Sequence, residues 1–256
     1  MAKIDFCRVV FGFFGILSLV PVAPALAADT IVNVTQTIVL SERGKTYDFS
    51  GKLHVWKGRN WNCNAEREDG PQILRVEADN ITVKNFKFIG DGKTSGSNGL
   101  GDPIHVASCG DGQGNLCPNR GPRNVVLDGI QGHACEDMIT IGTPGSENIT
   151  IQNSVLRATP RRASWDKTIQ INFGKNIRIL NNRFEGGVRC VRFKPNTTGE
   201  VRGNTFNGCG TAIQASSNDA DIKPMKNGPT VVTVRNNRYV GVGTQVRKIG
   251  SQVTIK

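Results

Sequence analysis

Residues 177–184 read Ile-Arg-Ile-Leu-Asn-Asn-Arg-Phe, in which the apolar residues Ile177 and Ile179 alternate with others and lead to Asn181 and Phe184. Related copies, in which two alternating positions precede an Asn or Gly, lie at residues 81–85, 125–129, 149–153, 199–203 and 232–236. Alternation with a period of two indicates β-strands. Asn and Gly are the residues that best tolerate a positive φ, so each copy predicts a strand that ends in a sharp turn.

The spacing of these copies predicts how the strands stack. A repeat of about 22 residues, lengthened where loops are inserted, is typical of a parallel β-helix, in which each coil buries its apolar rows against the next. An antiparallel sandwich would need Asn-Gly hairpins between matched strands, but Asn98-Gly99 and Asn227-Gly228 lie in Gly- and Lys-rich stretches. We therefore expect an all-β protein, a right-handed single-stranded parallel β-helix.

The N-terminus has the features of a secretory signal. A basic lead precedes an apolar stretch over residues 9–22, and Ala25-Leu26-Ala27 fits the small-x-small rule for cleavage. Two prolines interrupt the stretch, which disfavours a retained membrane anchor. We expect residues 1–27 to be removed and residues 28–256 to form a secreted β-helix catalytic domain with no membrane segment.

Six cysteines remain after that cleavage, and they are Cys63, Cys109, Cys117, Cys135, Cys190 and Cys209. An even number in an exported chain predicts up to three disulfides, and the sequence leaves their pairing open. A zinc site is the alternative, but the chain has no CxxC pair.

The chain is basic, with a formal net charge of +11. Such a charge attracts polyanions. Aromatic residues make up only 6% of the chain and no nucleic-acid-binding motif is present, so we expect no nucleic-acid partner. Acidic polysaccharides are the other polyanions that an exported protein meets, and charge alone does not distinguish these partners.

A second row of strands brings charged residues together. Residues 138–141, 168–171, 190–193 and 212–214 can be laid in register, and this places Ile139, Ile169, Val191 and Ile213 in one inward column. In that register Asp137, Lys167 and Arg189 occupy equivalent positions on successive coils. Thr140, Gln170 and Arg192 do the same on the outward face. Neighbouring coils are about 4.8 Å apart.

Two interpretations of these charges are open. Outward side chains on a β-helix are exposed, so the residues could form a salt-bridged surface ladder. Alternatively they form a binding site, because Arg189 and Arg192 repel each other unless an anion lies between them. The adjacent carboxylates of Glu136 and Asp137 are ligands that Ca²⁺ prefers.

Four segments in this region carry a family resemblance. They are DPIHV (102–106), CEDMITI (135–141), WDKTIQIN (165–172) and GGVRCVRF (186–193). In their order and residue types they resemble the pectate lyases of polysaccharide lyase family 3, which are compact secreted parallel β-helix enzymes.

The resemblance implies a role for each matching residue. Asp102, Glu136 and Asp137 would bind Ca²⁺, and Lys167 would contact a substrate carboxylate. Arg192 would be the catalytic base, and Arg189 stands where the family has lysine. We also expect Gln170 and the loop residue Arg162 to contact substrate. His105 is expected to be a loop residue satisfied by the backbone.

The implied reaction is Ca²⁺-dependent β-elimination on polygalacturonate (pectate) by a monomeric enzyme. The base removes the C5 proton, and positive charge around the carboxylate stabilises the anion that develops. We expect the rate to rise above neutral pH. Two alternatives remain: a polysaccharide hydrolase on the same fold, and a non-catalytic β-helix that binds acidic cell-wall polysaccharide.

Overall fold

The computed structural model describes residues 28–58, 61–62, 72–89, 98–99, 102–108, 120–134, 137–158, 167–218 and 227–256. The expected signal peptide, residues 1–27, lies outside these ranges. Within them, no helix has the length and apolar character needed to cross a membrane.

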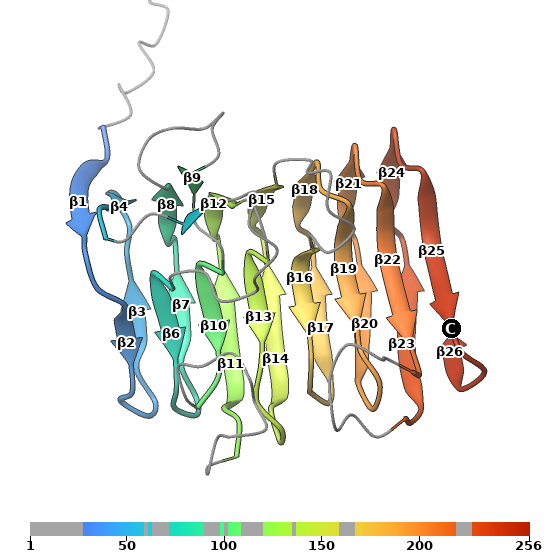
Figure 1. The fold of residues 1–256 in the computed structure, drawn as a ribbon. Coiled ribbons are helices and arrows are strands. Elements are labelled where there is room, and N and C mark those ends of the chain that lie inside the picture. The colour runs from blue at the N-terminus through green and yellow to red at the C-terminus, as the bar shows by residue number, and fades with distance from the viewer. Residues whose placement is uncertain are drawn as a thin grey trace, which may run out of the picture.

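Three parallel sheets run the length of the molecule (Figure 1). Apart from β5 (Trp61–Asn62) and β9 (Asn98–Gly99), which pair with each other, every third strand of the chain belongs to the same sheet. Sheet A contains β1 (Thr30–Val34), β4 (Lys52–Trp56), β8 (Lys87–Ile89), β12 (Gln131–Ala134), β15 (Val155–Ala158), β18 (Arg183–Glu185), β21 (Thr205–Asn207) and β24 (Arg238–Val240). Sheet B contains β2 (Ile38–Leu40), β6 (Leu74–Val76), β10 (Ile104–Val106), β13 (Ile139–Ile141), β16 (Lys167–Ile171), β19 (Arg189–Phe193), β22 (Thr211–Ser216) and β25 (Thr244–Ile249). Sheet C contains β3 (Thr46–Asp48), β7 (Thr82–Lys84), β11 (Arg123–Asp128), β14 (Glu147–Gln152), β17 (Ile177–Leu180), β20 (Thr198–Arg202), β23 (Thr230–Arg235) and β26 (Val253–Ile255).

This architecture is a parallel β-helix, as the sequence predicts. The repeat that begins at residue 81 forms the strands of sheet C, where Leu127 pairs with Ile151, Ile151 with Ile179, and Ile179 with Val201. Among the described strands, a single antiparallel pair joins β5 (Trp61–Asn62) to β9 (Asn98–Gly99). The sequence alone places Asn98-Gly99 in a Gly- and Lys-rich stretch and not in a strand.

The residues that end the repeats adopt the expected backbone conformation. Asn85, Asn153, Asn181 and Asn236 all have φ between 52° and 56°. Gly203 takes the equivalent place with a φ of 70°. These residues turn the chain out of sheet C on successive coils, which explains why the repeat ends in Asn or Gly.

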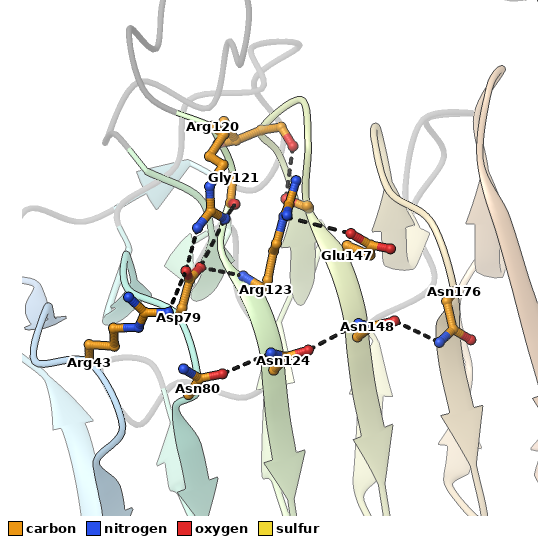
Figure 2. A network of polar contacts seen from close by, with 12 residues as sticks. Arg43, Asp79, Asn80, Arg120, Gly121, Arg123, Asn124, Glu147, Asn148 and Asn176 are labelled. Atoms are coloured by element: carbon orange, nitrogen blue, oxygen red, sulfur yellow. Dashed lines mark hydrogen bonds and ion pairs between the residues drawn. The ribbon is translucent and has the colours of Figure 1, made fainter.

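Asparagine side chains also join the coils to one another. An outer ladder runs through Asn80, Asn124, Asn148 and Asn176, each amide bonded to the next over 2.7–3.0 Å (Figure 2). A buried ladder passes through Asn182 and Asn204, where Asn182 Nδ2 donates to Ile151 O and to Asn204 Oδ1. Because these bonds join residues on adjacent coils, they hold one coil on the next.

The core lies between the three sheets and consists of stacked apolar columns. Ile139, Ile169, Val191 and Ile213 are all fully buried and form one column of sheet B. This column confirms the second predicted row and fixes which side chains of sheet B point outward.

Candidate active site

The outward face of sheet B carries the residues that the sequence singles out. Thr140 pairs with Gln170, and Gln170 pairs with Arg192, so the predicted row is confirmed. The row continues beyond it, to His105 on β10 and to Gln214 on β22. We call these five residues the central row.

A second row, the acid–base row, lies at the entry to the same strands. Lys167 pairs with Arg189 in the ladder between β16 and β19. Asp137 lies two positions before Ile139, which pairs with Ile169. Asp102 lies two positions before Ile104, which pairs with Ile139 on the next coil. The two carboxylates therefore stand on adjacent coils, followed by Lys167 and Arg189 on the next two.

Asp137 and Lys167 are in direct contact. The Lys167 backbone N–H donates to Asp137 Oδ1 over 3.2 Å, and Lys167 Nζ lies 3.8 Å from the same oxygen. The Asp137 carboxylate therefore accepts a hydrogen bond from the backbone of Lys167 and also faces the Lys167 ammonium group. The structure therefore brings together Asp102, Asp137, Lys167 and Arg189 on one side of the central row.

These charged side chains are not a surface ladder. Lys167 is only 2% exposed and Arg192 only 5%, and both aspartates are buried as well. Arg189 is partly exposed. The expectation of solvent-exposed outward side chains is therefore wrong for this face. Away from water, charge interactions are stronger and less screened, so the arrangement favours an anionic or metal-bridged ligand more than the sequence suggested.

His105 differs from its predicted setting. It lies in strand β10, it is buried, and its Nδ1 is 3.2 Å from the side-chain Nε2 of Gln72. Its Nε2 lies 3.7 Å from Asp102 Oδ2. Burial lowers the pKa of His105 to about 4, which the nearby Asp137 opposes and Arg75 reinforces. The imidazole is therefore neutral at physiological pH and lies beside the predicted metal ligands.

Sheet B contains several buried polar atoms that have no hydrogen-bond partner in the part of the chain that the structure describes. Among the described residues, most buried side-chain N and O atoms without a hydrogen-bond partner belong to sheet B or the residues flanking it. They include His105 Nε2, Thr140 Oγ1, Thr168 Oγ1, Gln170 Oε1, Asn172 Oδ1 and Ser216 Oγ. Buried polar groups normally have partners, and an unmet one costs about 1–3 kcal/mol. Their concentration distinguishes sheet B from sheets A and C.

A disulfide lies beside the cationic residues. Cys190, which follows Arg189 in β19, is bonded to Cys209, with a Cα–Cα distance of 6.0 Å. The bond links β19 to the turn that leads into β22 on the next coil. It confirms disulfide rather than zinc chemistry for these two cysteines; the other four lie outside the described residues.

Several solved structures are similar to this chain. No family model matches the sequence. Among solved structures, the chain is similar to the A-module of the Azotobacter vinelandii mannuronan C-5 epimerase AlgE6, with 12% sequence identity and a TM-score of 0.48. The match covers 90% of this chain and 57% of that chain, so it spans less than two thirds of the neighbour.

The structure describes two of the three predicted calcium ligands. Asp102 and Asp137 are on adjacent coils, whereas Glu136 lies outside the described residues, as does the predicted substrate contact Arg162. Within the described ranges no three His, Cys, Asp or Glu side chains are grouped to hold a metal ion. Two neighbouring carboxylates are nevertheless the hard oxygen donors that Ca²⁺ takes, and they leave most of its six to eight positions to other oxygens. The chemistry of this donor set fits Ca²⁺.

Proposed function

We propose that the protein is a secreted, monomeric pectate lyase that cleaves polygalacturonate by Ca²⁺-dependent β-elimination on the outward face of sheet B. The observation that supports this most strongly is the register of sheet B. It aligns two buried carboxylates, a buried ammonium group, the buried guanidinium group of Arg192 and the partly exposed one of Arg189 on adjacent coils of one sheet.

The substrate's chemistry accounts for the mixture of charges. Its C5 proton is α to a carboxylate, and removing that proton adds negative charge beside an existing anion. Ca²⁺ bound by Asp102, Asp137 and Glu136 would supply positive charge to the substrate carboxylate. Lys167 and Arg189 would bind the same carboxylate and hold the sugar ring beside Arg192.

Arg192 takes the proton in this proposal. In the proposed step the C5–H bond breaks, its proton passes to the guanidine, and its electron pair moves onto the carboxylate as an enolate-like anion. The C4–C5 double bond then forms as the C4–O bond breaks, and the departing oxygen takes a proton from the solvent. No water attacks. Free arginine is essentially always protonated, so the fraction that can accept a proton grows with pH.

The geometry favours elimination over hydrolysis. A glycosidase needs a protonated carboxylic acid on one side of the scissile bond. Asp137 instead accepts a hydrogen bond from Lys167 and faces its ammonium group. Such contacts stabilise the carboxylate form, which suits a metal ligand and not a proton donor.

One assay tests the proposal. The mature protein is incubated with polygalacturonate in the presence of Ca²⁺ and then of EGTA, and the ultraviolet absorbance of the conjugated unsaturated product is followed. We expect absorbance to grow only with Ca²⁺. New reducing ends without that absorbance would indicate a hydrolase, and binding without either product would indicate a non-catalytic module.

A further inference from the structure

A third row of polar side chains lies beyond the central row on sheet B. In the ladder of β16, β19 and β22, Ile171 pairs with Phe193, and Phe193 pairs with Ala215. The residues that follow these three core positions are Asn172, Lys194 and Ser216. Ser216 is in β22, whereas Asn172 and Lys194 come directly after β16 and β19, where their N–H groups continue the ladder by donating to Ile141 O and Ile171 O. Alternation along this backbone directs the three side chains outward like Gln170, Arg192 and Gln214, about 7 Å further along. We call Asn172, Lys194 and Ser216 the distal row.

The distal row is buried and includes polar atoms that the protein leaves unused. Asn172, Lys194 and Ser216 are at most 6% exposed. In the described part of the chain, Asn172 Oδ1 and Ser216 Oγ have no hydrogen-bond partner. An acceptor thus stands on each side of a buried lysine, one on the coil before it and one on the coil after it.

The backbone beneath the distal row is held in place. Thr230 Oγ1 lies 3.1 Å from Lys194 O and 2.7 Å from Ser216 O, and it bridges the two coils. Thr197 Oγ1 donates to Lys194 O over 2.6 Å. The Lys194 N–H continues the sheet ladder by donating to Ile171 O. These contacts fix the backbone that carries Lys194 and Ser216 before any ligand arrives, as a binding site requires.

We propose that the distal row is a sugar-binding subsite for the uronate residue next to the one that contacts Arg192, on the side away from the C4–O bond that breaks. Asn172 Oδ1 and Ser216 Oγ would bind its hydroxyl groups, and Lys194 would face its carboxylate. This proposal rests on the proposed function for the class of sugar. It adds three binding residues that lie apart from the acid–base row and from the transfer of the C5 proton.

The test uses variants that remove the unused polar atoms without changing shape. Asn172→Leu removes Asn172 Oδ1 together with the rest of the amide, and Ser216→Ala removes Ser216 Oγ; neither of these two oxygens has a hydrogen-bond partner among the described residues of the free protein. Replacing such a group with an apolar one of similar shape is nearly neutral or stabilising. We therefore expect the melting temperature to stay level or rise, while the Kd for tetragalacturonate, measured by calorimetry, rises about five- to tenfold.

The chain offers a matched control in Thr150. Its Oγ1 is also buried without a partner, and it lies on the outward side of β14 in sheet C, away from the proposed site. Thr150→Val removes a similar atom. We expect it to leave the Kd for tetragalacturonate and the kinetics of cleavage as in the wild type.

Substrate length separates the subsite from the reaction. In Asn172→Leu and Ser216→Ala, KM should rise for tetragalacturonate and stay unchanged for the shortest oligomer that is cleaved. A lowered melting temperature with unchanged Kd would show that these atoms are structural and would overturn the subsite. If the wild-type protein forms no unsaturated product but the two variants bind tetragalacturonate more weakly than it does, the subsite is supported and the lyase activity is refuted. A protein that neither binds nor cleaves galacturonate oligomers contradicts both.

Discussion

The buried pair of Lys167 and Asp137 provides a quantitative test of the acid–base row. Lys167→Met keeps the length of the side chain but takes away the ammonium group 3.8 Å from Asp137 Oδ1. Breaking a buried ion pair by removing one partner costs about 3–5 kcal/mol, because the other charge stays buried without it. In a domain of this size 1 kcal/mol corresponds to about 2–4 °C, so a loss of 3 kcal/mol lowers the melting temperature by roughly 6–12 °C.

Calcium gives this experiment a functional readout. If Asp137 is a metal ligand, Ca²⁺ can neutralise the carboxylate that Lys167→Met leaves behind. We expect thermal denaturation in EGTA to show the full loss, and Ca²⁺ to raise the melting temperature of the variant more than that of the wild type. The double variant Lys167→Met/Asp137→Leu should recover stability without calcium, because apolar residues can replace a buried pair at little cost.

An exposed lysine provides the control. Lys175 lies outside the strands of sheet B, and Lys175→Met should change stability by less than about 0.5 kcal/mol, as surface substitutions usually do. A melting temperature of Lys167→Met that matches that of the wild type in EGTA would refute the reasoning. So would a calcium effect of equal size in both proteins.

The remaining predictions concern the base, the buried histidine and the disulfide. Arg192→Ala should abolish formation of unsaturated product while still binding polygalacturonate, and product formed at the wild-type rate would exclude Arg192 as the base. The wild-type rate should rise from neutral to alkaline pH, and a rate that is highest in acid would contradict an arginine base. The pKa of His105 is lowered from 6.5 to about 4 in the folded state, so the unfolded chain binds more protons between these values and stability falls as the pH drops through that range. His105→Gln should therefore lose less stability than the wild type between about pH 6.5 and pH 4, which denaturation at a series of pH values measures. Cys190→Ala/Cys209→Ala opens a link across 19 residues and should lower stability by about 3 kcal/mol in denaturant titrations, whereas an unchanged midpoint would show that the bond contributes nothing.

The sequence predicts the stacking of this fold well because each coil repeats one local pattern. Alternation marks the inward residues, and Asn or Gly marks the turn. Together they place Ile151 on Ile179 and give Asn153 and Asn181 their positive φ. The same register predicts the neighbours of Lys167 and Gln170 on the next coil, since a strand that is correctly aligned in its core is correctly aligned on its outer face.

Other features of the structure cannot be predicted from the repeat in the sequence. Burial of Lys167 and Arg192 depends on three-dimensional packing, which alternation within a strand does not encode. His105 lies alone in a short strand beside a long insertion, and its contact with Gln72 joins two coils whose spacing in the sequence is irregular. The buried ladder through Asn182 and Asn204 follows the repeat by one residue, where the pattern gives no reason to expect a polar side chain.

The most direct test of the account is a crystal structure of Arg192→Ala with Ca²⁺ and a galacturonate oligomer. We predict that the ion contacts Asp102 and Asp137, and that a substrate carboxylate lies between the ion and Lys167 on the outward face of sheet B. An oligomer bound on sheet A or sheet C, with no ion at these aspartates, would contradict it.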